Sequence, residues 1–180
     1  MLFRSTAINM RRSIGWSNNV VTECVSGCYT LHPRSLATGP LTEQEWTSAR
    51  EATKEFAIAS TKLDDMPIGL LRYASSIREW TLGKIGKRRD SSYEFSNVGV
   101  FDGDAFGKDQ VKVTKMTFAQ PGHVGGCPIS FNVASVKGGD LVYTVTWQPG
   151  ALGLGDDEAM EEKIVEEICD NVKRGFNDVA

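Results

Sequence analysis

Two short runs of alternating hydrophobicity, joined by a pair of glycines, limit the fold of this chain more than any other feature. Residues 129–134 and residues 141–147 each place a large apolar side chain at every other position. A period of two is typical of β-strands that bury one face. Gly138 and Gly139 lie between the runs and supply the positive φ values of a tight turn. The sequence therefore predicts two antiparallel strands joined as a hairpin.

The segments before and after this hairpin show strand and helical patterns. In chain order they predict a strand at 20–31, helices at 42–63 and 65–83, strands at 93–101 and 111–118, the hairpin, and a final helix that begins near 156–158. Such an order of strands and helices is typical of an α+β fold. We expect a mostly antiparallel mixed sheet with helices packed on one side.

The predicted helices carry specific start and face signals. Thr42 and Glu45 match a capping box, in which each side chain accepts a hydrogen bond from the other residue's backbone amide. Asp65 is a suitable cap for the second helix, and Pro67 is tolerated near its first turn. In the final helix, apolar side chains recur every four residues: Met160, Ile164, Ile168 and Val172. This spacing predicts an amphipathic helix that packs on the sheet.

Length, composition and charge exclude several classes of protein. The chain has 180 residues, of which 41% are hydrophobic and 24% charged. These values are typical of one folded globular domain, here residues 1–180. A net charge of −3 provides no basic surface, which argues against a nucleic-acid partner. No run approaches the roughly 18–20 apolar residues that cross a bilayer, so we expect no membrane span.

The cysteines form no recognisable metal or disulfide pattern. They are Cys24, Cys28, Cys127 and Cys169. None lies in a Cys-x-x-Cys pair, and only His32 and His123 are available to complete a zinc site. We expect reduced thiols, no metal ion and a cytoplasmic location. Arginines and serines before Glu23 are weakly similar to a mitochondrial transit peptide, but this segment fits better as the first folded element.

No complete catalytic set is visible from the residues alone. His32 and His123 lie in no recognisable nucleophile motif. The carboxylate pairs at 64–65 and 156–157 adjoin predicted helix starts, where capping accounts for them. A thiol enzyme based on Cys127 needs a neighbouring base, which the sequence does not show. These patterns by themselves predict a folded domain without an assigned reaction.

Five segments carry a resemblance to a known family: residues 9–12, 31–34, 67–73, 92–101 and 138–141. Together they resemble the C-terminal half of the fungal alcohol acetyltransferases. That family belongs to the chloramphenicol-acetyltransferase-like superfamily of CoA-dependent acyltransferases, which includes the condensation domains of peptide synthetases. The resemblance covers about residues 9–176 and implies a single C-terminal acyltransferase-like lobe. Its most specific part, Phe95-Ser96-Asn97-Val98-Gly99, is similar to the Ser-Asn-Leu-Gly strand of the lipoyl-dependent acyltransferases.

The resemblance implies an activity and also shows what the chain lacks for it. Members of the superfamily use a His-x-x-x-Asp motif, whose histidine takes a proton from the acceptor as it attacks an acyl thioester. That motif lies in the N-terminal half of two-lobed members. Here Leu36 stands four residues after His32, and Cys127 stands four residues after His123, so the motif is absent. Whether the chain alone is an enzyme is therefore open.

Two functional hypotheses follow from the resemblance. In the first, the chain transfers an acetyl or other acyl group from acyl-CoA to an alcohol only when a His-x-x-x-Asp lobe is supplied. Acyl-CoA is then a cosubstrate, and no cofactor is permanently bound. In the second, the chain is a non-catalytic binding module, or pseudoenzyme, that keeps the tunnel surface for CoA or a protein partner. A lobe built to pack against another should expose apolar surface and tend to self-associate.

The resemblance also implies roles for particular residues. Ser96 matches a serine that donates a hydrogen bond to the oxyanion of the tetrahedral intermediate; its alternative role is that of an ordinary polar strand residue. Asn97 and Gly99 are expected to shape a bend that orients Ser96. Arg11 and Arg12 match a tunnel-lining strand near the lobe junction, or alternatively form structural ion pairs. The weaker candidates are His32, Arg34 and Arg72.

Overall fold

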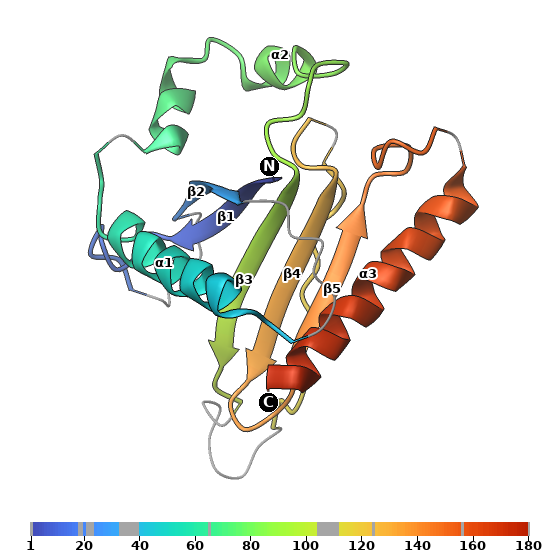
Figure 1. Ribbon diagram of the computed structural model, residues 1–180. Helices are drawn as coiled ribbons and strands as arrows, with labels where there is room; N and C mark the ends of the chain where they lie inside the picture. The colour runs from blue at the N-terminus through green and yellow to red at the C-terminus, as the bar shows by residue number, and fades with distance from the viewer. Residues whose placement is uncertain are drawn as a thin grey trace.

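The computed structural model describes residues 2–17, 20, 24–32, 40–64, 66–103, 112–123, 125–155 and 157–179. Figure 1 shows one sheet with helices around it. The strands are β1 (Leu2–Asn9), β2 (Val25–His32), β3 (Tyr93–Phe101), β4 (Ile129–Val136) and β5 (Leu141–Trp147). The helices are α1 (Glu43–Ala59), the 3₁₀ helix η1 (Pro67–Tyr73), α2 (Ile77–Leu82) and α3 (Glu158–Val179). The predicted α+β class is confirmed.

The five strands form a mixed sheet in the order β2-β1-β3-β4-β5. The outer pairs, β1 with β2 and β4 with β5, are antiparallel. The inner pairs, β1 with β3 and β3 with β4, are parallel. The expectation of a mostly antiparallel sheet is therefore wrong. The physical reason lies in the connections, because long crossovers separate both inner pairs and allow their strands to run in the same direction.

One face of the sheet is covered by α1 and α3, and we call it the helix face. The strand register places Arg4 of β1 and Tyr143 of β5 on this same face. The Arg4 guanidinium lies 4.9 Å from the centre of the Phe56 ring in α1. The Tyr143 hydroxyl donates a hydrogen bond to the Cys169 carbonyl oxygen in α3, 2.6 Å away. Both long helices thus pack on one side of the sheet, as Figure 1 shows.

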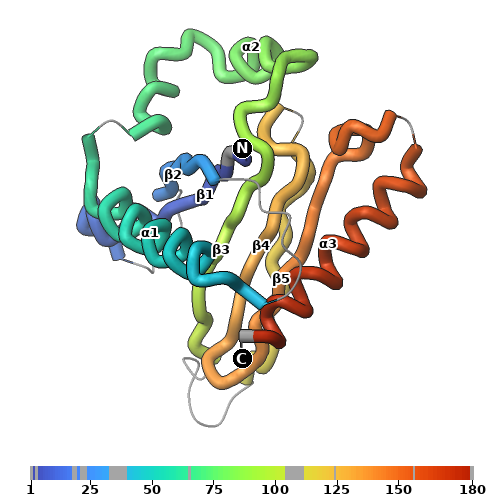
Figure 2. Tube along the Cα trace, in the orientation of Figure 1, coloured from blue at the N-terminus to red at the C-terminus, as the bar shows by residue number. Residues whose placement is uncertain are grey.

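The opposite face carries a group of hydrogen-bonding side chains, and we call it the polar face. Its central residues are Glu94 and Ser96 of β3, Ser130 and Asn132 of β4, and Thr144 and Thr146 of β5. Residues 112–120 run beside this face, because the Thr144 hydroxyl donates to the Phe118 carbonyl oxygen at 2.5 Å. The chain from η1 to α2 passes over one end of the sheet, seen in green in Figure 2.

The capping box and the hairpin are confirmed. Thr42 accepts a hydrogen bond from the Glu45 amide at 3.3 Å, and the Glu45 carboxylate accepts one from the Thr42 amide at 2.8 Å. The hairpin joins β4 to β5, with Gly138 at a φ of +73°. The final helix is also present, although Met160 is exposed and the buried position next to it is Glu161.

Two predicted elements differ in the structure. The second helix is divided into η1 and α2, because Ala74 is extended and the Ser76 hydroxyl caps a new helix by accepting from the Glu79 amide at 3.2 Å; Asp65 lies outside the described residues. The strand predicted at 111–118 forms no ladder over its described part, residues 112–118.

No helix in the described ranges is both long and apolar enough to span a membrane.

Candidate functional site

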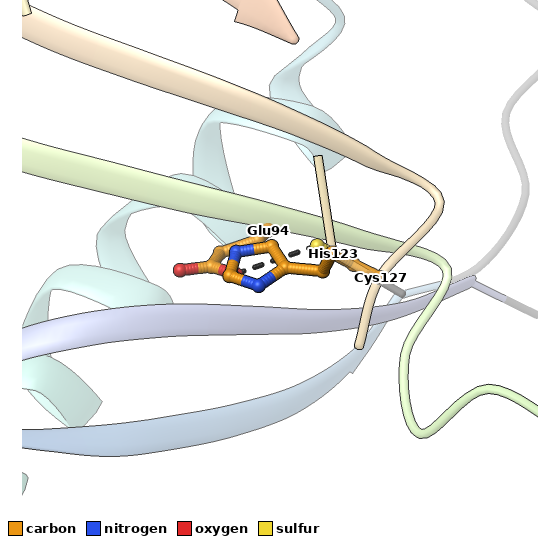
Figure 3. A group of neighbouring side chains, drawn as sticks. All are labelled: Glu94, His123 and Cys127. Carbon is orange, nitrogen blue, oxygen red and sulfur yellow. Dashed lines mark hydrogen bonds and ion pairs between the residues drawn. The ribbon is translucent and has the colours of Figure 1, made fainter. Parts of the chain in front are cut away.

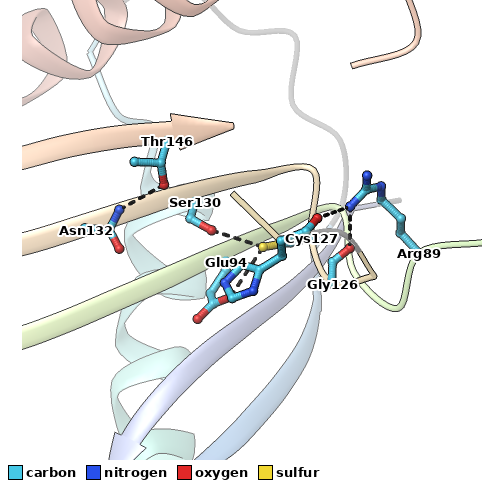
Figure 4. A network of polar contacts seen from close by, with 8 residues as sticks. Arg89, Glu94, Gly126, Cys127, Ser130, Asn132 and Thr146 are labelled. Atoms are coloured by element: carbon cyan, nitrogen blue, oxygen red, sulfur yellow. Dashed lines mark hydrogen bonds and ion pairs between the residues drawn. The ribbon is translucent and has the colours of Figure 1, made fainter. Parts of the chain in front are cut away.

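Ser96 is a buried residue on the polar face of β3, with 5% of its surface exposed. Its register partner on β4 is Asn132, which has no exposed surface. The Asn132 amide nitrogen donates to the Thr146 hydroxyl at 3.3 Å (Figure 4), while its carbonyl oxygen accepts no hydrogen bond in the part of the chain that the structure describes. A buried acceptor without a partner costs about 1–3 kcal/mol. The neighbourhood of Ser96 is therefore polar and buried, and it holds a hydrogen-bond acceptor without a partner in the described residues.

Asn97 and Gly99 lie in an irregular part of β3 immediately after Ser96. The register with β4 shifts between Asn97 and Val100. The Asn97 side-chain oxygen accepts a hydrogen bond from the Gly99 amide at 2.8 Å, and Gly99 has a φ of +85°. Asn97 pairs with Val133 and so faces the helices, whereas Ser96 faces the opposite side. The structure thus brings Asn97 and Gly99 together as a bulge and separates the Asn97 side chain from that of Ser96.

Arg11 and Arg12 lie in a turn, because β1 ends at Asn9. The Arg11 amide donates to the Asn9 side chain at 3.0 Å, and its guanidinium donates to the Val20 carbonyl oxygen at 3.4 Å. Arg12 is exposed. These contacts are local to the turn, and the structure does not bring the two arginines to the polar face beside Ser96.

The weaker candidates also lie away from Ser96. His32 is on the helix face, where its ring nitrogen Nε2 lies 2.9 Å from the Thr30 hydroxyl. Partial burial, with a contribution from the nearby Arg4 guanidinium, lowers the pKa of His32. Arg72 is exposed and lies over the Tyr73 ring, 4.6 Å from its centre. Arg34 lies outside the described residues.

The structure brings together a cluster that sequence reasoning missed: Glu94, His123 and Cys127. Glu94 lies on the polar face of β3, and the other two come from the loop before β4 (Figure 3). His123 Nε2 is 3.3 Å from Glu94 Oε2, and Cys127 Sγ is 3.4 Å from the same oxygen. The spacing of His123 and Cys127, four positions apart, is a signal in the local sequence that these two side chains can meet. Glu94 gives no such signal, because it stands 29 positions before His123. Only the fold reveals that this base and acid lie beside the thiol.

Arg89 holds the loop that carries His123 and Cys127. Its guanidinium donates to the carbonyl oxygens of His123 at 2.7 Å and Gly126 at 3.1 Å, and to the Gln148 side chain at 3.3 Å. Figure 4 shows the hydrogen bonds from this arginine to carbonyl oxygens of the loop beside Gly126 and Cys127. A planar guanidinium with several fixed donors suits such a role better than a lysine does. The cluster is thus supported from outside by a fixed side chain.

The pKa values of all three members of the cluster differ from their ordinary values. Contact with the His123 imidazole lowers the pKa of Glu94, against the opposing effect of burial. Contact with the Glu94 carboxylate raises the pKa of His123. Burial raises the pKa of Cys127 to about 11. Roughly one Cys127 thiol in ten thousand is then ionised at pH 7, so the hypothesis of a thiol enzyme gains a neighbouring base but lacks the reactive thiolate.

The Glu94–His123 pair predicts a defined pH dependence of stability. The raised pKa of His123 stabilises the fold at pH values below its unfolded value of 6.5, and this contribution is lost as pH rises through the folded pKa. The lowered pKa of Glu94 stabilises the fold above its unfolded value of 4.5, and this contribution is lost as pH falls through the folded pKa. In metal-free buffer, the Tm difference between wild type and His123→Gln should be largest between those two values.

His32→Gln is the matched control for this prediction. Because the pKa of His32 is lowered, its contribution is full above 6.5 and declines as pH falls. The Tm difference for His123→Gln should therefore fall as pH rises above 6.5, whereas the Tm difference for His32→Gln should stay flat there and change as pH falls below 6.5. A Tm difference for His123→Gln that stays flat from pH 4 to 9 contradicts the pairing.

A pocket of about 600 Å³ opens on the polar face beside Glu94. Its walls come from β1 and β2 on one side and from η1, α2 and Lys84 on the other. Ile68, Leu71 and Trp80 give it an apolar wall, and Lys84 lies 4.2 Å from the centre of the Trp80 ring. Glu94 precedes Ser96 by two residues, so both side chains point to the face on which the pocket opens.

The amino-acid sequence of the chain is similar to that of a known protein. The chain is 30% identical over 171 residues to a probable alcohol acetyltransferase of Fusarium pseudograminearum (strain CS3096). The match covers 86% of this chain and 34% of the relative, so the chain spans about a third of that protein's length. The resemblance to fungal alcohol acetyltransferases is therefore confirmed. No family profile matches the chain, and no solved structure matches it.

Proposed function

We propose that this chain is the C-terminal lobe of a CoA-dependent alcohol O-acyltransferase of the cytoplasm. It transfers an acetyl or other acyl group from acyl-CoA to a small alcohol once a lobe with the His-x-x-x-Asp motif is supplied. The observation that carries the proposal is the similarity to a probable alcohol acetyltransferase over 86% of this chain but only 34% of the relative. The greater part of such a protein lies outside the matched region.

An exposed apolar surface supports the need for a second lobe. Large hydrophobic side chains of β2, η1 and α2 are exposed: Val25, Tyr29, Leu31, Ile68, Leu70, Tyr73, Ile77 and Trp80. Several of them line the same pocket, so β2 and the η1–α2 segment form one neighbouring surface. Contiguous apolar surface of this kind marks an interaction site in a soluble protein. A lobe that carries the His-x-x-x-Asp motif, or a second copy of the chain, is the partner that this surface fits.

Each lobe has a separate task in the proposed reaction. The histidine of the supplied lobe removes the proton of the alcohol as its oxygen attacks the thioester carbonyl carbon. The carbonyl oxygen becomes an oxyanion, and Ser96 donates a hydrogen bond to it. The intermediate then collapses, the carbon–sulfur bond breaks, and CoA leaves as a thiol with the proton from the histidine. Asn97 and Gly99 hold the bulge after Ser96, Arg11 fixes the turn after β1, and the exposed Arg12 is available to the other lobe at the junction.

A pseudoenzyme that binds CoA or a protein partner is the alternative function. The observation that favours it is the sequence itself, in which neither His32 nor His123 belongs to a His-x-x-x-Asp motif. The experiment that distinguishes the two functions measures release of CoA thiol from acetyl-CoA in the presence of short and medium alcohols. We expect no turnover from the chain alone and turnover when it is joined to a lobe carrying the motif. A joined protein that binds acetyl-CoA without turnover supports the pseudoenzyme.

A further inference from the structure

The Glu94–His123–Cys127 cluster has the donor set of a metal site. It offers one carboxylate oxygen, one imidazole nitrogen and one sulfur, and these atoms all lie within 4.8 Å of one another. Cys127 is 3% exposed, and the side chains of Glu94 and His123 are 17% and 37% exposed. Carboxylate, imidazole and thiolate are the three ligand types that zinc takes in proteins. We propose that these residues bind one zinc ion, which joins β3 to the loop before β4.

Two of the three donor–donor distances in the cluster match those of a tetrahedral zinc site, and the third is within 4.8 Å. With a Zn–S bond of about 2.3 Å and Zn–N and Zn–O bonds of about 2.0–2.1 Å, tetrahedral angles separate sulfur from oxygen by about 3.5 Å and nitrogen from oxygen by about 3.3 Å. The corresponding distances here are 3.4 Å from Cys127 Sγ to Glu94 Oε2 and 3.3 Å from His123 Nε2 to Glu94 Oε2. The two distances to the Glu94 oxygen are thus those expected when one ion lies between the donors.

The nitrogen of His123 provides a second, independent observation. His123 Nε2 is buried and makes no regular hydrogen bond within the described part of the chain, although it faces the Glu94 carboxylate at 3.3 Å. The two atoms are close enough for charge attraction. A buried ring nitrogen in this position loses its hydration without a full replacement. Coordination of a cation shared with Glu94 satisfies both atoms.

Neighbouring groups provide the outer contacts that metal ligands require. The Ser130 hydroxyl lies 3.1 Å from Cys127 Sγ and donates to that sulfur once it is a thiolate. Arg89 fixes the loop through the His123 and Gly126 carbonyl oxygens. Outer contacts of this kind orient the ligands and tune metal affinity. Bound zinc also removes the proton from a coordinating thiol, which overcomes the high pKa of Cys127 in the free chain.

A cobalt titration tests the proposal on the full 180-residue chain. The purified chain is stripped with a chelator, and Co²⁺ is added while absorbance is recorded. We expect one equivalent of Co²⁺ to give a thiolate-to-cobalt charge-transfer band in the near ultraviolet and the visible bands of tetrahedral cobalt. One equivalent of Zn²⁺ should abolish both. Saturation with Zn²⁺ should also raise the Tm, because the ion binds the folded chain.

Variants assign the binding to the three residues. Competition with a chromophoric chelator should show that Cys127→Ser and Glu94→Gln each weaken Zn²⁺ affinity by at least about 100-fold, and that Ser130→Ala weakens it by about 10-fold. Cys169→Ser, which removes a thiol outside the cluster, should leave the affinity unchanged. Circular dichroism should be recorded for each variant to check that it is folded.

Two results overturn the proposal. One is the absence of a thiolate-to-cobalt band in the wild-type chain, a measurement that needs no variant to fold. The other is equal Zn²⁺ affinity in wild type and Cys127→Ser. Neither result bears on acyl transfer, because the titration uses no CoA or alcohol.

Discussion

Replacing Ser96 with alanine in the joined, two-lobed enzyme is expected to lower kcat by about 10- to 1000-fold and to leave KM nearly unchanged. The substitution removes one neutral donor that acts on the oxyanion, and loss of such a donor raises the barrier by a few kcal/mol. An interaction made only in the transition state affects kcat and kcat/KM equally. Steady-state kinetics with acetyl-CoA and one alcohol measure the effect.

Ser26→Ala is the matched control for Ser96→Ala. Ser26 is also buried in a strand, with 3% exposure, but its register with Ile8 places it on the helix face. Ser26 borders the pocket beside Glu94, but its side chain points away from the face that carries Ser96, so its removal should leave kcat within about two-fold of wild type. If Ser96→Ala keeps the full kcat while remaining folded, the oxyanion role is wrong. Ser96 is then a strand residue that shapes the polar face.

Replacing Glu161 with alanine is expected to destabilise the fold by about 3 kcal/mol or more. Glu161 is 1% exposed, and its carboxylate oxygens accept hydrogen bonds from the amides of Gly150 at 2.9 Å and Leu152 at 3.1 Å. The side chain thus ties α3 to the glycine-rich loop after β5. Its loss leaves two amides without their charged acceptor, and each such bond contributes about 1.5–3 kcal/mol.

Thermal unfolding measures this loss and separates it from a general effect of charge. For a chain of this size, about 3 kcal/mol corresponds to a fall in Tm of roughly 6–12 °C. Glu161→Gln keeps one acceptor oxygen and should lose about half as much. Glu162→Ala removes the same charge from an exposed neighbour and should change the stability by no more than about 0.5 kcal/mol. Equal Tm values for the Glu161 and Glu162 alanine variants contradict the assigned contacts.

Local signals predicted the local structure of this chain well. The capping box at Thr42 and Glu45, the strand Tyr93–Phe101 and the hairpin between β4 and β5 depend on residues close in sequence. The strand Leu2–Asn9 was missed, and with it the parallel centre of the sheet. A strand in the middle of a sheet is fixed by its neighbours, here β2 and β3, more than by its own residue pattern.

The candidate site depends even more than the sheet on residues that are far apart in the sequence. Ser96 could be selected by resemblance, but its burial beside Asn132 depends on a pairing between strands separated by a long connection. Glu94, His123 and Cys127 meet because Arg89 and the register of β3 with β4 bring the loop to the strand. His123 and Cys127 are close in sequence, but Glu94 is 29 positions before His123 and shares no local spacing with them. Long-range contacts therefore account for both the missed cluster and the misjudged sheet.

The most direct test of the central claim compares the chain alone with the chain joined to a lobe that carries the His-x-x-x-Asp motif. Release of CoA thiol from acetyl-CoA is measured with a panel of short and medium alcohols. We predict no turnover above background from the chain alone, turnover from the joined protein, and its loss when the motif histidine becomes alanine. Alcohol-dependent turnover by the chain alone, abolished by replacing His123 or His32, contradicts the claim that the general base lies outside this chain.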